Sequence, residues 1–196
     1  MVHSERRLIV SRRQLTLVAG LLVVAATLTP TVALGHTSKV AYDWHVGDVF
    51  LQSLGFPVGE QAIAPNGDVL TIQGTGSFSA DGKWATGGGT FSHHVAATNT
   101  TITGTFTADR VISFQFYGCG TEGLPPNFCG GLLDLAITAT PDAAPSVHLA
   151  GSLRINCEIG PNLPASVVEG VRVNVYDVIN FNKPVAESGA NIYIAQ

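Results

Sequence analysis

Charge is the scarcest property of this chain. Its 196 residues include only 10 basic and 14 acidic side chains, which is 12% and about half of the roughly 25% usual for a soluble domain. With 45% apolar residues, the chain is not of the disordered class, which combines low hydrophobicity with high net charge. A formal net charge of −4 provides no basic footprint, so we expect no nucleic-acid partner.

Catalytic motifs are also missing. The sequence contains no Gly-x-Ser-x-Gly, no His-Glu-x-x-His and no Cys-x-x-Cys. The glycine run 87–89 is followed by neither Lys-Ser/Thr nor a helical pattern, so it is not a phosphate loop. The acidic residues are scattered, and no two of them stand out as a pair. We therefore assign no catalytic residue, expect no cofactor and no bound metal, and lean away from an enzyme.

The first 35 residues have the layout of a secretory signal peptide. Four arginines precede an uncharged apolar run over 15–28, which Pro30 and the small residues Ala33 and Gly35 follow. The run is shorter than the ~20 residues that span a bilayer, so we expect no membrane span in the mature form. Residues 11–15 (SRRQL) also resemble a twin-arginine signal, and both export routes stay open, as does cleavage after Ala33 or after Gly35.

The predicted product is a secreted single domain over 36–196. It has 6 basic and 13 acidic residues, hence a formal charge of −7. Its low charge is therefore a property of the domain and not of the leader.

All three cysteines lie in this exported part, where an oxidising compartment permits disulfides. Cys119 and Cys129 flank a turn-rich stretch between two strand-like runs, and we predict that they are bonded to each other. Cys157 is in phase with the apolar face of a strand, which favours a free, buried thiol. A disulfide that uses Cys157 is the alternative.

From Val69 onward the apolar residues recur with period two, which is typical of half-buried strands. The clearest runs are 147–159 and 171–175, and Gly, Pro, Asn and Asp clusters separate the runs. No stretch has the period of an amphipathic helix. The pattern predicts an all-β fold, a single antiparallel β-barrel or β-sandwich of about eight or nine strands, with an edge strand near Val46–Leu51.

Histidines offer weak metal sites. His93 and His94 are neighbours, so in a strand they point to opposite faces and do not readily share one metal ion. We expect one of them to be inward and hydrogen-bonded, and His148 to lie on the surface. If cleavage follows Gly35, His36 becomes the N-terminus, which resembles the histidine brace of secreted copper polysaccharide monooxygenases. This makes a copper oxidase a remote alternative.

Aromatic residues suggest a binding surface. Trp44, Trp84 and Tyr117 are the candidate ligand-binding residues, because exposed rings on a β-sheet can stack on sugars. The alternative is that these rings are buried with their polar tips hydrogen-bonded.

Several ordered blocks are similar to a group of small exported all-β proteins of bacteria and fungi that have no assigned activity. They are ATGGGTFSH (85–93), YGCG (117–120), PPNFCGG (125–131), CEIGP (157–161), INFNKPV (179–185) and NIYI (191–194). This resemblance covers about residues 70–196 and implies a shared fold without supplying a catalytic residue. The segment GTGSF (74–78) more weakly resembles strands of dirigent and allene-oxide-cyclase barrels, which implies an apolar barrel mouth that holds a small ligand.

The leading hypothesis is a non-catalytic extracellular binding or surface-associated module whose unknown ligand is a small molecule or a glycan. The alternative is a small-molecule-binding barrel with dirigent-like or isomerase-like activity. These two hypotheses predict different structural features. A barrel of this kind needs an apolar cavity of roughly 300 Å³ or more, whereas the surface module needs exposed aromatic rings.

Overall fold

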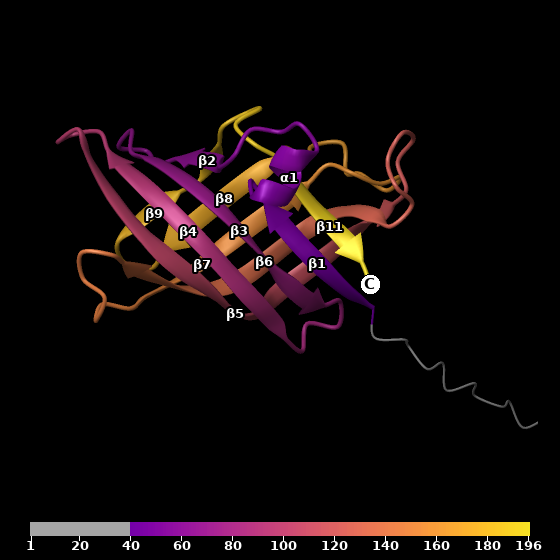
Figure 1. Ribbon diagram of the computed structural model, residues 1–196, viewed down its shortest axis with the longest axis horizontal. Coiled ribbons are helices and arrows are strands. Elements are labelled where there is room, and N and C mark those ends of the chain that lie inside the picture. Colours follow the sequence, from indigo (N-terminus) through magenta and orange to yellow (C-terminus); the bar gives the residue numbers. More distant parts are fainter. Residues whose placement is uncertain (1–39) are drawn as a thin grey trace, which may run out of the picture. The chain divides into compact units, whose positions relative to one another are not determined.

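Alternating apolar residues form one antiparallel sheet of eleven strands in residues 40–196, the part of the chain that the computed structural model describes (Figure 1). The predicted signal peptide and His36 lie outside the described residues. The strands are β1 (Ala41–Val46), β2 (Glu60–Ile63), β3 (Val69–Ser79), β4 (Ala85–Val95), β5 (Thr100–Cys119), β6 (Phe128–Pro141), β7 (Leu149–Cys157), β8 (Gly170–Val175), β9 (Ile179–Phe181), β10 (Lys183–Pro184) and β11 (Asn191–Ala195). The predicted all-β antiparallel class is confirmed. The strand number exceeds the expected eight or nine partly because β9 and β10 are too short to show a period.

The expected edge strand over Val46–Leu51 is wrong. The strand here is β1, which ends at Val46 and pairs on both sides, with β3 and with β11. Gly47 follows with a φ of +50°, a conformation that favours glycine. Asp48 then caps the short helix α1 (Val49–Ser53), because its side chain accepts a hydrogen bond from the Leu51 amide. Within residues 40–196, no helix is long and apolar enough to cross a membrane.

Six of the strands pair in a closed circuit that begins and ends at β1. β1 pairs with β3, β3 with β4, β4 with β5, β5 with β6, β6 with β11, and β11 with β1. The same long strands also extend the sheet, because β6 continues through β7 and β8 to β9, and β3 continues through β2 to β10. Three register shifts interrupt the β5–β6 pairing, and such bulges bend a strand and increase its twist.

The disulfide between Cys119 and Cys129 is present, as predicted. It joins the ends of β5 and β6 and so closes the turn-rich stretch between them. Cys157 is free and buried, which confirms the second part of that prediction.

Aromatic rings fill one end of the interior. Tyr42 stacks on Phe78 with ring centroids 5.4 Å apart, and Phe114 and Tyr193 contact Phe78 edge-on at 4.8 and 5.7 Å. We call these four residues the aromatic end. Next to it, the Trp44 ring lies beside Gly76, where any side chain would collide with the indole nitrogen, and that nitrogen donates to the Thr86 carbonyl at 3.2 Å.

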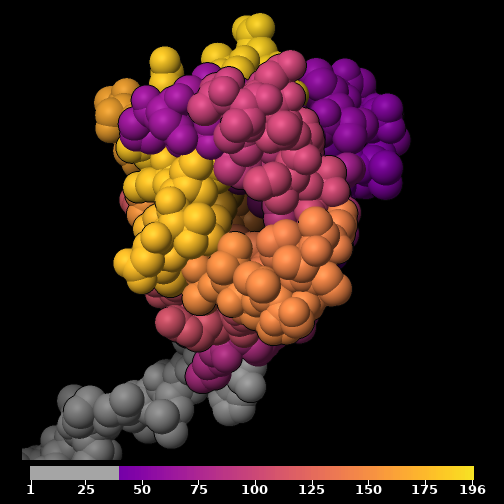
Figure 2. All heavy atoms as spheres, turned by 90° about the vertical axis from the view of Figure 1, so that its left-hand side faces the viewer, coloured from indigo at the N-terminus to yellow at the C-terminus, as the bar shows by residue number. Residues whose placement is uncertain are grey.

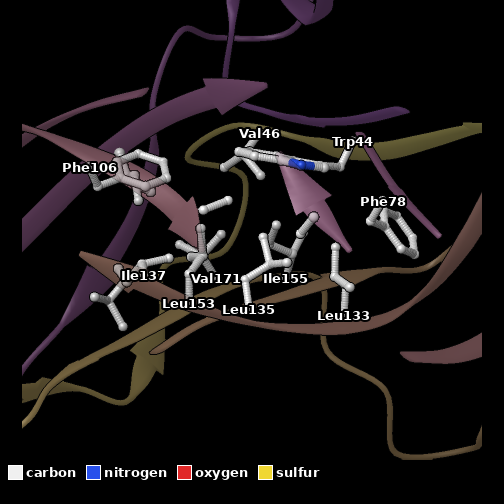
Figure 3. Packing of buried hydrophobic residues seen from close by; sticks show 14 of the residues in the cluster. Trp44, Val46, Phe78, Phe106, Leu133, Leu135, Ile137, Leu153, Ile155 and Val171 are labelled. Carbon is white, nitrogen blue, oxygen red and sulfur yellow. The ribbon is translucent and has the colours of Figure 1, made fainter. Parts of the chain in front are cut away.

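The centre of the core combines mainly aromatic side chains on one side with aliphatic side chains on the other. Figure 3 shows the side chains of β1, β3 and β5 facing those of β6, β7 and β8. The labelled residues are Trp44, Val46, Phe78 and Phe106 on one side, and Leu133, Leu135, Ile137, Leu153, Ile155 and Val171 on the other.

Candidate functional site

A cavity of about 380 Å³ lies in the interior, away from the aromatic end. Of its eighteen lining residues, fifteen are apolar and three are polar. The apolar residues are Leu70 and Ile72 of β3, Phe91 and Val95 of β4, Ile102 and Phe106 of β5, Ile137, Ala139 and Pro141 of β6, Leu149 of β7, Val173 and Val175 of β8, Val178 of the following turn, and Ile179 and Phe181 of β9. We call this region the hollow end.

The cavity opens to the surface where the turns between strands gather. Figure 2 faces this end and shows a hollow bounded by the ends of β4 in magenta, the β6–β7 turn in orange and the β8–β9 region in yellow. At this mouth, Val178 is 63% exposed and Ile102 is 41% exposed. A small molecule therefore has a route from solvent to the apolar walls.

The three polar lining residues are Asn66, Asp68 and His93, and the first two belong to the turn between β2 and β3. Gly67 has a φ of +88°, and the Ala64 amide donates to the Asp68 carbonyl at 2.9 Å. The Asp68 amide in turn donates to Oδ1 of Asn66 at 3.2 Å. These bonds fix the turn and direct the Asp68 carboxylate toward the end of β4.

Asp68 and His93 form a close pair. Oδ1 of Asp68 accepts from the Ala96 amide at 3.0 Å, and its Oδ2 lies 2.8 Å from Nε2 of His93. Phe181 holds the imidazole from another side, with an edge-to-face contact at 5.1 Å. His93 shares its strand face with the cavity residues Phe91 and Val95, because alternate residues of a strand lie on one face.

The hydrogen bond from His93 holds the pKa of Asp68 below its usual value. The carboxylate is therefore ionised at neutral pH although the residue is only 4% exposed. An ionised carboxylate only accepts hydrogen bonds, so Nε2 of His93 holds the proton and Nδ1 has the free lone pair in the neutral ring. Within residues 40–196, Nδ1 makes no hydrogen bond.

The neighbouring histidine differs from His93. His94 lies on the opposite strand face and is half-buried. The sequence assigned Asp68 only to a turn, and its partner 25 residues away was not identified. One signal in the sequence could have indicated this site. His93 is two residues from both Phe91 and Val95, which places a histidine on an otherwise apolar strand face.

Of the three aromatic candidates, two are buried. Trp44 is 0% and Tyr117 2% exposed, and the Tyr117 hydroxyl donates to Asn156 Oδ1 at 3.2 Å. These rings pack in the core and offer no face to a sugar. Trp84 is 39% exposed, and neither it nor the other two lines the cavity.

A second polar group is buried away from the cavity. Glu60 is 1% exposed, its Oε1 accepts from Ser188 at 3.4 Å, and its Oε2 has no hydrogen-bond partner within residues 40–196. Burial, and next the charge of Glu169, raise the pKa of Glu60 to about 8. Burial also raises the pKa of Glu169 to about 7. The sequence did not single out this pair.

Candidate metal ligands do not gather in the described part of the chain. Residues 40–196 contain no group of three or more His, Cys, Asp or Glu side chains that could hold a metal ion. His148 is exposed and hydrogen-bonds to Thr140 at 3.1 Å. His36, on which the copper-oxidase alternative depends, lies outside the described residues.

No family model, no curated protein and no solved structure matches this chain. These comparisons leave both resemblances described above untested. The function is therefore proposed from the residues of the hollow end alone.

Proposed function

We propose that this chain binds a small apolar molecule in the cavity at the hollow end. The observation that supports this most is a cavity of about 380 Å³ in which only three of eighteen lining residues are polar. Protein interiors normally contain few voids larger than a water molecule. Sites for small molecules are typically apolar cavities of about 300–1,000 Å³ with a few polar groups that orient the ligand.

In this proposal the sheet is a barrel and the cavity is its mouth. The support is the closed circuit of pairings through β1, β3, β4, β5, β6 and β11, together with the close approach of β2 to β8 on the other side. A sandwich of two separate sheets would leave unpaired edges between them. Side chains from seven strands converge on the cavity, as they would in a barrel.

The small-molecule alternative now has more support than the surface module. The surface module needed exposed aromatic rings, and Trp44 and Tyr117 are buried. Trp84 is the only exposed ring of the three candidates, so it gives the surface module little support.

We place the protein outside the cytoplasm. The disulfide between Cys119 and Cys129 is typical of proteins in oxidising compartments. The layout of residues 1–35 agrees with this, because it is that of a signal peptide.

The uncharged fluorophore N-phenyl-1-naphthylamine tests the binding proposal, because its emission rises in apolar surroundings. Wild-type protein is expected to bind it with a Kd in the micromolar range. Ala139→Trp places an indole in the cavity and is expected to weaken binding at least about tenfold, which is a loss of ~1.4 kcal/mol.

Ala136→Trp is the matched control, because Ala136 lies on the same strand with its side chain on the opposite face. It is expected to bind the fluorophore like the wild type, and circular dichroism checks that both variants fold. Absence of binding to wild-type protein, or equal binding by folded Ala139→Trp, would overturn the proposal.

A further inference from the structure

The hollow end has its polar groups on one side only. Asn66, Asp68 and His93 lie together, and the remaining lining is apolar. A cavity that only shelters an apolar molecule does not need an ionised carboxylate paired with an imidazole. This pair ties the β2–β3 turn to β4, and it also leaves an imidazole in the wall of the cavity.

The hydrogen bonds determine which polar atoms remain free to interact with a ligand. Both carboxylate oxygens of Asp68 are used, one by the Ala96 amide and one by Nε2 of His93. The only imidazole nitrogen left is Nδ1, which has no partner in residues 40–196. His93 lines the cavity, so Nδ1 is the proton acceptor available to a bound molecule.

We infer that the hollow end is a site of proton transfer, in which His93 is the general base, Asp68 is its positioning residue, and the substrate is a small apolar molecule with an acidified C–H bond. This inference rests on the proposed binding function and adds a reaction to it. It also gives the buried Asp68–His93 pair a role that binding alone does not require.

The reaction needs no co-reactant. The C–H bond breaks, its proton forms a bond to Nδ1, and its electron pair stays on the substrate as a delocalised anion. His93 then returns the proton to a different atom of the same molecule, so that the net change is an isomerisation. Asp68 remains ionised and stabilises the imidazolium ion between the two steps.

The surroundings favour this chemistry. Charge interactions are stronger in a site of low dielectric than in water, and the Asp68 carboxylate is fixed by two hydrogen bonds before the ligand arrives. Oδ1 of Asn66 already accepts from the Asp68 amide, which leaves its Nδ2 as a donor. Because Asn66 lines the cavity, we expect this donor to stabilise an oxygen of the substrate that becomes negative.

The probe 5-nitrobenzisoxazole measures this proton abstraction directly. A base removes its C3 proton, the N–O bond breaks, and 2-cyano-4-nitrophenolate forms, which is followed by its visible absorbance. Wild-type protein is expected to accelerate the reaction over buffer with saturation kinetics.

His93→Gln is the most informative variant, since the glutamine amide can still donate to Asp68 and preserve the tie between the β2–β3 turn and β4. It is expected to lower kcat/KM by about 100-fold or more. In His93→Ala, added imidazole should restore part of the rate, which a purely structural role of His93 would not allow. Asp68→Asn is expected to lower kcat by about tenfold and to leave KM nearly unchanged.

His94→Ala is the matched control, because it removes a histidine from the adjacent position on the other strand face and should leave the rate unchanged. A rate that persists in folded His93→Gln, or that falls equally in His94→Ala, would overturn the inference.

Binding is followed separately with the inert analogue 5-nitroindole, which should displace N-phenyl-1-naphthylamine. Displacement without any acceleration would overturn the proton-transfer inference and leave the binding proposal standing. Failure of both ligands to bind would overturn both.

Discussion

The two ends of the interior are built by the same strands and differ in how their side chains meet. On β3, Phe78 belongs to the aromatic end, whereas Leu70 and Ile72 line the cavity. On β5, Phe114 contacts Phe78 ring to ring, whereas Ile102 lies at the cavity mouth. One sheet thus supplies dense packing at one end and a space for a ligand at the other.

The difference shows that aromatic content alone does not fill a core. Phe91, Phe106 and Phe181 also line the cavity, but they lie on its walls. At the aromatic end, the rings contact each other directly, with centroids 4.8 to 5.7 Å apart. We therefore expect substitutions to affect stability strongly at the aromatic end and weakly at the hollow end.

The largest expected effect is from Phe78→Ala. Phe78 is 0% exposed and contacts three rings, so its removal should lower the free energy of unfolding by about 4 kcal/mol. Ile102→Ala, at a residue 41% exposed, should cost about 1 kcal/mol. Urea denaturation measures both values, and similar losses would contradict the contrast between the two ends.

Substitutions by a larger side chain should likewise be more destabilising in the packed core than in the cavity. Ala62 is fully buried, so Ala62→Phe overpacks the core and should lower the free energy of unfolding by about 3 kcal/mol. Ala139→Phe places the same ring in the cavity and should change it by less than about 1 kcal/mol. If thermal unfolding shows that Ala139→Phe is as destabilising as Ala62→Phe, the cavity is not free space.

Glu60 and Asp68 should give opposite pH dependences. The pKa of Glu60 is raised to about 8 in the folded protein, so folding favours its protonated form. Its contribution to stability is therefore fully present below the usual pKa of 4.5 and is lost as the pH rises through about 8. The pKa of Asp68 is lowered, so its contribution is present above its usual pKa of 3.8 and is lost as the pH falls through the lower, folded-state pKa. Glu60→Gln should therefore raise stability at pH 8.5 by on the order of 2 kcal/mol and change little at pH 4.

Chemical denaturation at pH 4, 6 and 8.5 checks this. Asp68→Asn serves as the comparison, because the pKa of Asp68 is lowered and removal of this carboxylate should not raise stability at pH 8.5. A Glu60→Gln variant with the same pH dependence as the wild type would contradict the assignment of the raised pKa to Glu60.

Local patterns predicted much of this fold. Alternation over 147–159 and 171–175 predicted β7 and β8, and the turn-rich stretch between Cys119 and Cys129 predicted their disulfide. The helix α1 was missed because five residues are too few to show a helical period. Its only local signal is the capping Asp48.

The candidate site was less accessible to sequence reasoning. A cavity depends on how far side chains from seven strands extend toward one another, and no single strand contains that information. Asp68 and His93 meet only because the β2–β3 turn lies beside the end of β4. Trp44 and Tyr117 were candidates by residue type, but type does not determine which strand face is buried.

The central claim is that the hollow end is a ligand site, and methyl NMR with N-phenyl-1-naphthylamine tests it most directly. We predict that the methyl signals of the cavity residues Ile72, Ile137 and Val173 shift on titration, while those of Leu133 and Leu153, which do not line the cavity, stay in place. Saturable shifts confined to the cavity methyls would support the account. Shifts restricted to exposed residues such as Ile112, with the cavity methyls unchanged, would contradict it.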